Sequence, residues 1–223
     1  MTNLGELVDL SHTIYDGLAT YPGLPAPVIR PHLTRADSRS VYAAGTEFAI
    51  DQISMVGNTG TYLDSPFHRD AAGDDLAALS LTRLVRLPAS VVHLDGAGHR
   101  GITADDLAGV AIHGHAVLLP TGWDRHFGTP GYGSGAPFLT AAACQYLIDQ
   151  RAVLVGIDSV NIDDTESGGE RPAHTLLLRA CIGIVEHLTE LGRLPAQGAL
   201  FTAVPPKVRG FGTFPVRAFA ELP

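Results

Sequence analysis

Lysine is almost absent from this 223-residue chain, in which Lys207 is the only one. Basic residues total 15 against 23 acidic residues, so the formal charge is −8. This balance argues against a basic surface that would bind nucleic acid. Lys207 follows Pro205 and Pro206 rather than a glycine-rich stretch, which excludes a Walker A phosphate loop.

Cysteine is also scarce: Cys144 and Cys181 are the only two, and they do not form a C-x-x-C pair. This spacing argues against a zinc knuckle or a thioredoxin-like redox site. Both residues lie in apolar stretches typical of helices, so we expect two buried, reduced thiols. A G-x-S-x-G nucleophile elbow is missing too, which argues against a serine mechanism of the α/β-hydrolase type.

Long apolar runs are missing as well, since none approaches the roughly 18 to 20 residues that span a bilayer. The first 16 residues carry Glu6 and Asp9 and have no basic segment leading into an apolar core, unlike a secretory signal peptide. We therefore expect a soluble, cytoplasmic protein that does not associate with a membrane.

Short apolar runs alternate with helix-like stretches along the chain, which favours an α/β fold. Buried strands are predicted at 90–94, 116–120, 152–157 and 199–204, and the N-terminal third should contain little helix. Helices are predicted at 141–150 after the cap Thr140, at 104–107, and from about 176 to 191, ending at Gly192. No repeat or charged linker divides the chain, so residues 1–223 are predicted to form a single domain.

The first candidate site lies in 57–68, the densest group of unusual residues. In an extended chain, Asn58, Tyr62 and Asp64 share one face, and Gly60 leaves room between them for a ligand or metal. His68 follows Pro66 and can turn over the same surface. The group suits acid–base chemistry or ligand binding, and the alternative is a polar turn at the end of a strand.

The second candidate site joins the end of the 152–157 strand to His174 and Glu186. Glu186 stands among apolar residues, where a carboxylate is costly to bury unless it is paired or binds a cation. If both residues were helical, their spacing would rotate them about 120° apart, so His174 would have to lie off the helix. The alternative is a helix-terminal histidine and an exposed acid. The remaining histidines, His187 included, are expected at the surface, with His12 the weakest case.

Together the two clusters resemble the cyclase-type family of metal-dependent hydrolases, which includes bacterial kynurenine formamidase and isatin hydrolase. The family signature H-x-G-T-H-x-D-x-P-x-H stands here as NTGTYLDSPFH, residues 58–68. Similar segments follow the family order elsewhere: DLSHTIYDGLATYPG near the start, VLLPTGW, LVGIDSVNID, and PPKVRGFGTFPVRAFA near the end. The resemblance covers nearly the whole chain.

The resemblance implies a β-rich, barrel-like central layer flanked by helices, and a homodimer or larger oligomer with the site near a subunit interface. It implies one or two divalent ions, zinc or manganese, with Asp64, His174 and Glu186 at ligand positions and His68 at that of the general acid–base. Two family ligand histidines are replaced by Asn58 and Tyr62, and a neutral phenol is a poor ligand for these metals. A single ion with mixed oxygen and nitrogen ligands is therefore expected.

The predicted function is an arylformamidase-like hydrolase of a small amide, formamide or lactam that uses metal-activated water. One alternative is a metal-free acid–base cyclase, dehydratase or lactone-opening enzyme, because two ligand histidines are replaced. Another is a non-catalytic small-molecule binder. Catalytic roles are assigned to His68 for proton transfer, Tyr62 for hydrogen bonding to the oxyanion, and Asp64. Substrate contacts are assigned to Asn58, Phe67 and Trp123.

Overall fold

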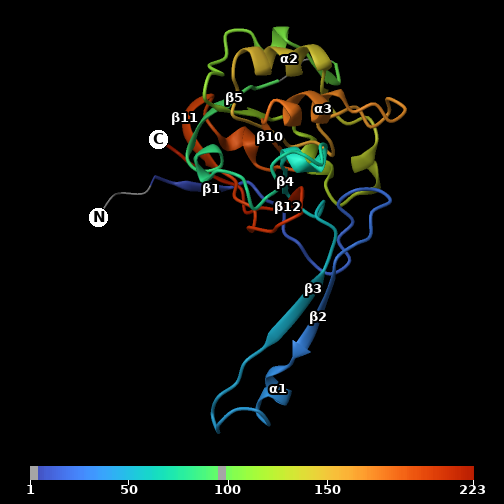
Figure 1. Ribbon diagram of the computed structural model, residues 1–223, viewed down its shortest axis with the longest axis vertical. Helices are drawn as coiled ribbons and strands as arrows, with labels where there is room; N and C mark the ends of the chain where they lie inside the picture. Colours follow the sequence, from blue (N-terminus) through green and yellow to red (C-terminus); the bar gives the residue numbers. More distant parts are fainter. Residues whose placement is uncertain (1–4, 95–98) are drawn as a thin grey trace.

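A curled sheet of nine strands forms the centre of the computed structural model, which describes residues 5–94 and 99–223 (Figure 1). Its order is β1-β13-β11-β5-β7-β9-β10-β4-β12. The strands are β1 (Leu7–Asp9), β4 (Tyr62–Asp64), β5 (Leu87–Val91), β7 (Ala116–Leu119), β9 (Leu154–Ile157), β10 (Gly183–Glu186), β11 (Gln197–Thr202), β12 (Thr213–Pro215) and β13 (Phe219–Glu221). The start of the segment considered for a signal peptide, residues 1–4, lies outside the described residues.

The middle of the sheet is parallel and buried on both faces. Strands β5, β7, β9 and β10 run parallel to one another, and all other pairs in the sheet are antiparallel. Along β7, Val117 and Leu119 face one core cluster while Leu118 faces the other. The helices α2 (Ala141–Asp149) and α3 (Pro172–Arg179) pack against each other beside the first of these clusters (Figure 1). This confirms the predicted α/β fold with a β-rich central layer.

Shorter elements connect these layers. A two-stranded parallel pair joins β6 (Gly101–Ile102) to β8 (Phe138–Leu139). Three of the predicted strands largely coincide with β7, β9 and β11, whereas the one predicted at 90–94 overlaps β5 only at residues 90 and 91. As predicted, α2 begins after Thr140, whose side chain accepts a hydrogen bond from the Ala143 amide. The short predicted helix near 104 is a 3₁₀ turn. The 3₁₀ helices are Pro66–His68, Leu81–Arg83, Asp105–Leu107, Trp123–His126, Pro130–Gly133 and Leu191–Arg193.

The predicted helix from 176 to 191 is wrong in most of its length. Helix α3 ends at Arg179, Cys181 adopts a φ of 58°, and the chain then enters β10. The β-branched residues Ile184 and Val185 are fully buried there between β9 and β4. Long-range strand pairing therefore decided the structure of a segment whose local apolar spacing also fits a helix. The exposed turn also places Cys181 at the surface, so only Cys144 is buried as predicted.

The N-terminal third contains a long hairpin, here called the arm, that extends away from the sheet (Figure 1). It consists of β2 (Val28–Leu33) paired antiparallel with β3 (Ile50–Ser54), and the short α1 (Arg35–Ser38) lies near its tip. Every residue of β3 is exposed. In the described ranges, no helix is both long and apolar enough to cross a membrane.

Candidate functional site

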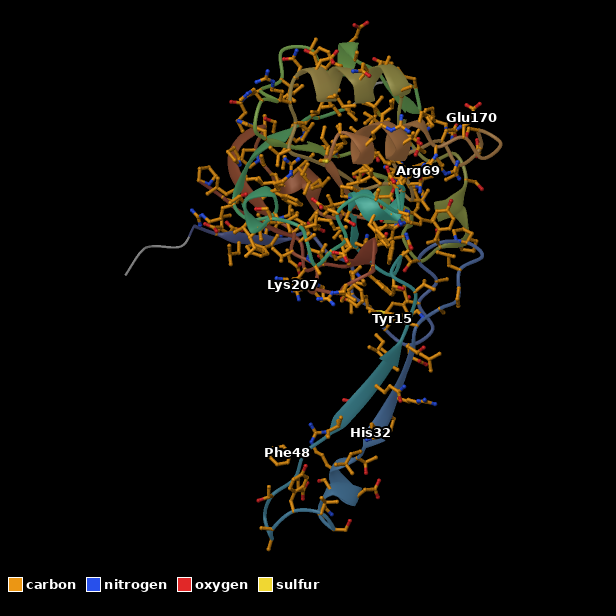
Figure 2. All side chains as sticks on the ribbon, viewed as in Figure 1. Tyr15, His32, Phe48, Arg69, Glu170 and Lys207 are labelled. Carbon is orange, nitrogen blue, oxygen red and sulfur yellow. The ribbon has the colours of Figure 1, made fainter. Side chains whose placement is uncertain are left out.

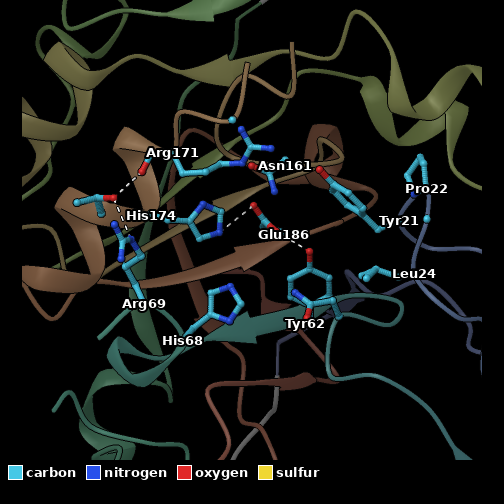
Figure 3. Close-up of a pocket in the computed structure, with 14 residues that line it drawn as sticks. Tyr21, Pro22, Leu24, Tyr62, His68, Arg69, Asn161, Arg171, His174 and Glu186 are labelled. Atoms are coloured by element: carbon cyan, nitrogen blue, oxygen red, sulfur yellow. Dashed lines mark hydrogen bonds and ion pairs between the residues drawn. The ribbon is translucent and has the colours of Figure 1, made fainter. Parts of the chain in front are cut away.

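A cavity of about 650 Å³ brings the two predicted clusters together (Figure 3). Asn58, Tyr62, His68, His174 and Glu186 all line it. Asp64 lies fully buried beside them, with its Oδ2 atom 3.6 Å from His174 Nε2.

Two of the predicted substrate contacts lie elsewhere. Neither Phe67 nor Trp123 lines the cavity. Phe67 is half-buried, and its amide donates to the Asp74 carbonyl. Trp123 packs against Tyr132 and donates its indole N–H to the carbonyl of that residue. Asn58 is therefore the one predicted substrate contact that reaches the cavity.

Strand pairing, not a helix, places Glu186 in the site. It stands directly opposite Tyr62 in the antiparallel β10–β4 pair. The Tyr62 hydroxyl donates to Glu186 Oε2 over 2.6 Å, and the Ile162 amide donates to Oε1 over 2.6 Å. The sequence analysis expected His174 to lie off the helix, whereas His174 is on α3 and Glu186 is on a strand.

Gly60 does not leave room for a ligand. Its φ is 65°, so the chain is not extended there, and a Cβ at this position would lie 2.8 Å from the Ile14 side chain. The space is filled by an apolar residue of the N-terminal segment. Tyr62 and Asp64, by contrast, do share one face of β4, as the two-residue spacing predicts.

His174 is held by a residue that the sequence analysis did not single out. Its Nδ1 lies 2.7 Å from Asp163 Oδ2, and the Asp163 carboxylate also accepts from the backbone amides of Ala173 and His174. Asp163 therefore both caps the start of α3 and orients the ring. Because Nδ1 donates to this carboxylate, the lone pair of a neutral His174 is on Nε2, which faces Asp64 and Glu186.

The buried donor atoms fit a divalent ion. Asp64 Oδ2 has no hydrogen-bond partner in the described part of the chain, although Asp64 is fully buried. His174 Nε2 lies 3.6 Å from this oxygen and 3.7 Å from Glu186 Oε1. Those separations are too long for hydrogen bonds, but two tetrahedral ligands, each about 2.1 Å from one ion, stand about 3.4 Å apart. Ligand atoms of Asp64, His68 and His174 also lie within 4.8 Å of one another.

The charges of the site also favour a cation. Burial raises the pKa of Glu186 to about 7, with the neighbouring Asp64 charge adding to the effect and His174 opposing it. Burial would likewise raise the pKa of Asp64, but the imidazoles of His174 and His68 hold it below its ordinary value. Burial lowers the pKa of His174, yet the surrounding carboxylates outweigh it and raise that pKa. A cation bound between these two buried carboxylates would offset both their burial cost and their mutual repulsion.

A hydroxyl links Asp64 to His68. Thr213 Oγ1 donates its only proton to Asp64 Oδ1, and it lies 2.7 Å from His68 Nδ1. Since the hydroxyl has no second proton, Nδ1 of His68 must be the donor in that contact. A neutral His68 therefore has its lone pair on Nε2, while the side chain stays about one third exposed on the cavity.

The structure does not favour Tyr62 as an oxyanion donor, because its only proton is committed to Glu186. His187 Nε2 lies 3.2 Å from the Tyr62 hydroxyl, and His187 Nδ1 lies 2.8 Å from the Tyr132 hydroxyl. His187 is fully buried, contrary to the expected surface position, and burial lowers its pKa to about 3. His12 is mostly buried as well and stacks on Phe127.

Comparison with known proteins supports the same chemistry. A family model described as putative cyclase matches residues 8–164. An isatin hydrolase of Roseibium aggregatum is 31% identical over 205 residues, which cover 80% of this chain and 77% of that protein. A kynurenine formamidase of Geobacillus thermodenitrificans is 31% identical over 213 residues, covering 95% of each.

Solved structures share the fold. An isatin hydrolase bound to the product analogue thioisatinate has a TM-score of 0.81 and 25% identity, covering 98% of this chain and 92% of that one. A potential metal-dependent hydrolase with cyclase activity has a TM-score of 0.77 and 26% identity, covering 96% of both chains. The arm and the central sheet thus belong to a shared architecture that spans almost the full described chain.

Proposed function

Because the chain belongs to the putative cyclase family, which includes hydrolases of C–N bonds, we propose that it hydrolyses a small amide, formamide or lactam. The observation that carries the proposal is the position of His174 Nε2 beside an open cavity, 3.6 Å from the buried, unpartnered Asp64 Oδ2 and 3.7 Å from Glu186 Oε1. We propose that these three residues hold one zinc or manganese ion. Glu186 Oε1 can do so because it keeps a lone pair beyond the one used by the Ile162 amide.

The residues around these proposed ligands supply the proton transfers. A divalent ion bound there would lower the pKa of a water molecule toward neutrality. His68 Nε2 takes a proton from the attacking water, because its Nδ1 is held by Thr213, and then returns it to the leaving nitrogen. Asp64 keeps that hydroxyl oriented, and Tyr62 fixes Glu186 rather than the oxyanion. Asn58 lines the cavity and is proposed to contact the substrate.

We also propose that residues 1–223 act as one cyclase-type domain and assemble as a homodimer or larger homo-oligomer. The first point is supported by β1 and β13, which come from opposite ends of the chain and pair in one sheet. The second is supported by the arm, because an isolated two-stranded hairpin is only marginally stable in water. A cytoplasmic location stays a prediction.

Metal content and formamide turnover test the proposed function together. Protein purified without chelator or metal-affinity resin should contain about one zinc or manganese ion per chain and hydrolyse formanilide. EDTA should abolish turnover, and either metal should restore it, whereas His68→Ala should lose about 100-fold or more of kcat. Full activity after complete metal removal would favour the metal-free alternative. A metal-loaded enzyme that opens no formamide, amide or lactam would overturn the proposal.

A further inference from the structure

A chain of buried hydrogen bonds ends on Glu186. The Tyr62 hydroxyl gives its only proton to Glu186 Oε2 over 2.6 Å (Figure 3). The 3.2 Å contact between that hydroxyl and His187 Nε2 must therefore use the N–H of the ring. A neutral imidazole with its proton on Nε2 accepts on Nδ1, so the Tyr132 hydroxyl donates to Nδ1 over 2.8 Å. Three hydrogen bonds thus run in one direction, from Tyr132 to the carboxylate.

The chain lies apart from water and from the substrate. His187 is fully buried, and burial lowers its pKa to about 3, so the ring is neutral. Tyr132 is 3% exposed, and the residues that line the cavity include Tyr62 but neither Tyr132 nor His187. Hydrogen bonds that follow one another in a buried chain polarise and strengthen each other. Any effect of the ring on the site must therefore pass through the Tyr62 hydroxyl.

The backbone holds the ring in an uncommon conformation. His187 directly follows β10 with a φ of 54°, in the left-handed region that few residues other than glycine adopt. Its amide donates to the Ser159 carbonyl over 3.3 Å, and its carbonyl accepts from the Thr61 hydroxyl over 2.5 Å. The partner Tyr132 is fixed as well, because its carbonyl accepts from the Trp123 indole over 2.9 Å. Such backbone strain persists only where the surrounding structure enforces it, and it gathers at functional sites.

We propose that His187 and Tyr132 are positioning residues that act on Glu186 through Tyr62. The chain keeps the Tyr62 proton on Oε2, so Glu186 presents Oε1 to the metal ion. This inference rests on the metal site of the proposed function, and it adds two residues outside the cavity to those that fix its ligands. Loss of such a supporting partner typically lowers metal affinity by about 10- to 100-fold.

The direction of the chain can be measured without a metal. Nitrogen chemical shifts of the histidine rings distinguish the two neutral tautomers, and the His187 signals are assigned by their loss in His187→Gln. At about pH 8, above the pKa of about 7 of Glu186, His187 should carry its proton on Nε2. A proton on Nδ1 would overturn the proposal, because Tyr62 would then have to donate to the ring instead of to the carboxylate.

Zinc affinity tests whether the chain acts on the ligand. Chelator competition would give the zinc Kd of the wild type, His187→Leu and His187→Gln. Glutamine can donate to Tyr62 and accept from Tyr132, whereas leucine can do neither, and both side chains are unbranched at Cβ. The leucine variant should bind zinc about 10- to 100-fold more weakly, and the glutamine variant should come within about threefold of the wild type. Equal affinity in the wild type and the leucine variant would contradict the proposal.

A tyrosine pair extends this test to the start of the chain. Tyr132→Phe removes one hydroxyl that does not line the cavity and should weaken zinc binding by about fivefold or more. Tyr146→Phe is the matched control, since Tyr146 is a half-buried tyrosine on α2 that packs against the core cluster there. It should leave the zinc Kd unchanged.

A double-mutant cycle separates positioning from a merely structural role. In the Tyr62→Phe background, His187→Leu should weaken zinc binding by less than about a further twofold, because its effect passes through the missing hydroxyl. Losses that simply add would overturn the proposal. A wild type that binds no zinc would overturn the proposed metal site, and the ring-nitrogen signals would still decide whether His187 directs the Tyr62 proton to Glu186.

Discussion

At the scale of single residues, the hydrogen bonds around the two site imidazoles decide which nitrogen of each ring is free. Asp163 occupies Nδ1 of His174, and Thr213 occupies Nδ1 of His68. Both rings therefore present Nε2 to the cavity, one for a metal and the other for a proton. Loss of such a supporting partner typically costs about 10- to 100-fold in metal affinity or activity.

Thr213 tests this arrangement for proton transfer. Thr213→Val keeps the shape of the side chain but removes the hydroxyl between Asp64 and His68, so kcat on formanilide should fall about 10- to 100-fold. Thr213→Ser restores the hydroxyl and should recover most of the activity, with an unchanged pH profile. Wild-type rates in the valine variant would show that His68 does not need this support.

His187 should make the protein sensitive to acid. Its pKa is lowered by burial from 6.5 to about 3, so the stability that comes from its neutral form is complete above about pH 6.5 and is lost as the pH falls toward 3. Between about pH 7.5 and pH 5 the free energy of unfolding should drop by about 2 kcal/mol from this group alone. Urea denaturation at both pH values measures the drop.

His187→Asn is the matched variant, because asparagine tolerates the φ of 54° at this position. The variant should be less stable at neutral pH, since it loses contacts with Tyr62 and Tyr132. Between pH 7.5 and pH 5, however, its free energy of unfolding should drop by about 2 kcal/mol less than that of the wild type. An unchanged pH dependence would assign the acid sensitivity to other groups.

At the scale of elements, β10 determines the site more than either helix does. It contributes Glu186, and its pairing with β4 sets Glu186 opposite Tyr62. The sequence 183–186 is short and apolar, and such runs fit a buried strand or a helix equally well by periodicity. Only the neighbouring strands distinguish the two, which is why the sequence analysis placed Glu186 on a helix.

The close approach of the 212–213 segment to the turn after β4 gives a test at this scale. A Cβ on Gly212 would lie 2.5 Å from the backbone nitrogen and Cα of His68, so Gly212→Ala must displace the His68 turn. We expect kcat to fall by about tenfold or more, because small displacements of a catalytic group are costly. Gly192→Ala, where nothing lies within 4 Å and φ is not positive, is the control and should retain activity. Full activity of Gly212→Ala would show that His68 tolerates this shift.

At the scale of the whole molecule, the arm extends away from the central sheet and leaves its apolar side chains in water (Figure 1). It carries seven of the exposed large apolar side chains, and Figure 2 labels one of them, Phe48, at the edge of the arm. The seven are Val28, Ile29, Val41, Tyr42, Phe48, Ile50 and Ile53. A second copy of the chain that covers this surface would remove it from water.

Charge placed on the arm should therefore separate the subunits without unfolding them. Ile29 and Ile53 face each other across the hairpin, at 39% and 46% exposure. The double change Ile29→Asp and Ile53→Asp should convert a dimer into a monomer in light scattering, with little change in Tm because the arm lies outside the core clusters. Gln52→Glu, an exposed change on the same strand, should leave the dimer intact. A wild type that is monomeric at micromolar concentration would contradict the homodimer.

The amino-acid sequence by itself determined the family, the α/β class and most of the residues that meet at the cavity. The spacing of Tyr62 and Asp64 sets them on one strand face, and the 58–68 motif with its companions identified the family that the putative cyclase match confirms. Such features are local or ordered along the chain, so they can be recognised without knowing which segments touch. The strands at 116–119 and 154–157 were predictable for the same reason.

Tertiary structure alone decided the contacts between distant segments. Thr213 contacts His68 although 145 positions separate them in the sequence. Asp163 contacts His174 because its carboxylate caps the start of α3, and Glu186 reaches the site through strand pairing. His187 was misplaced at the surface because nothing near it in the sequence reveals the two tyrosine hydroxyls that make its burial possible. Burial and hydrogen-bond partners depend on which segments pack together, and sequence spacing does not contain that information.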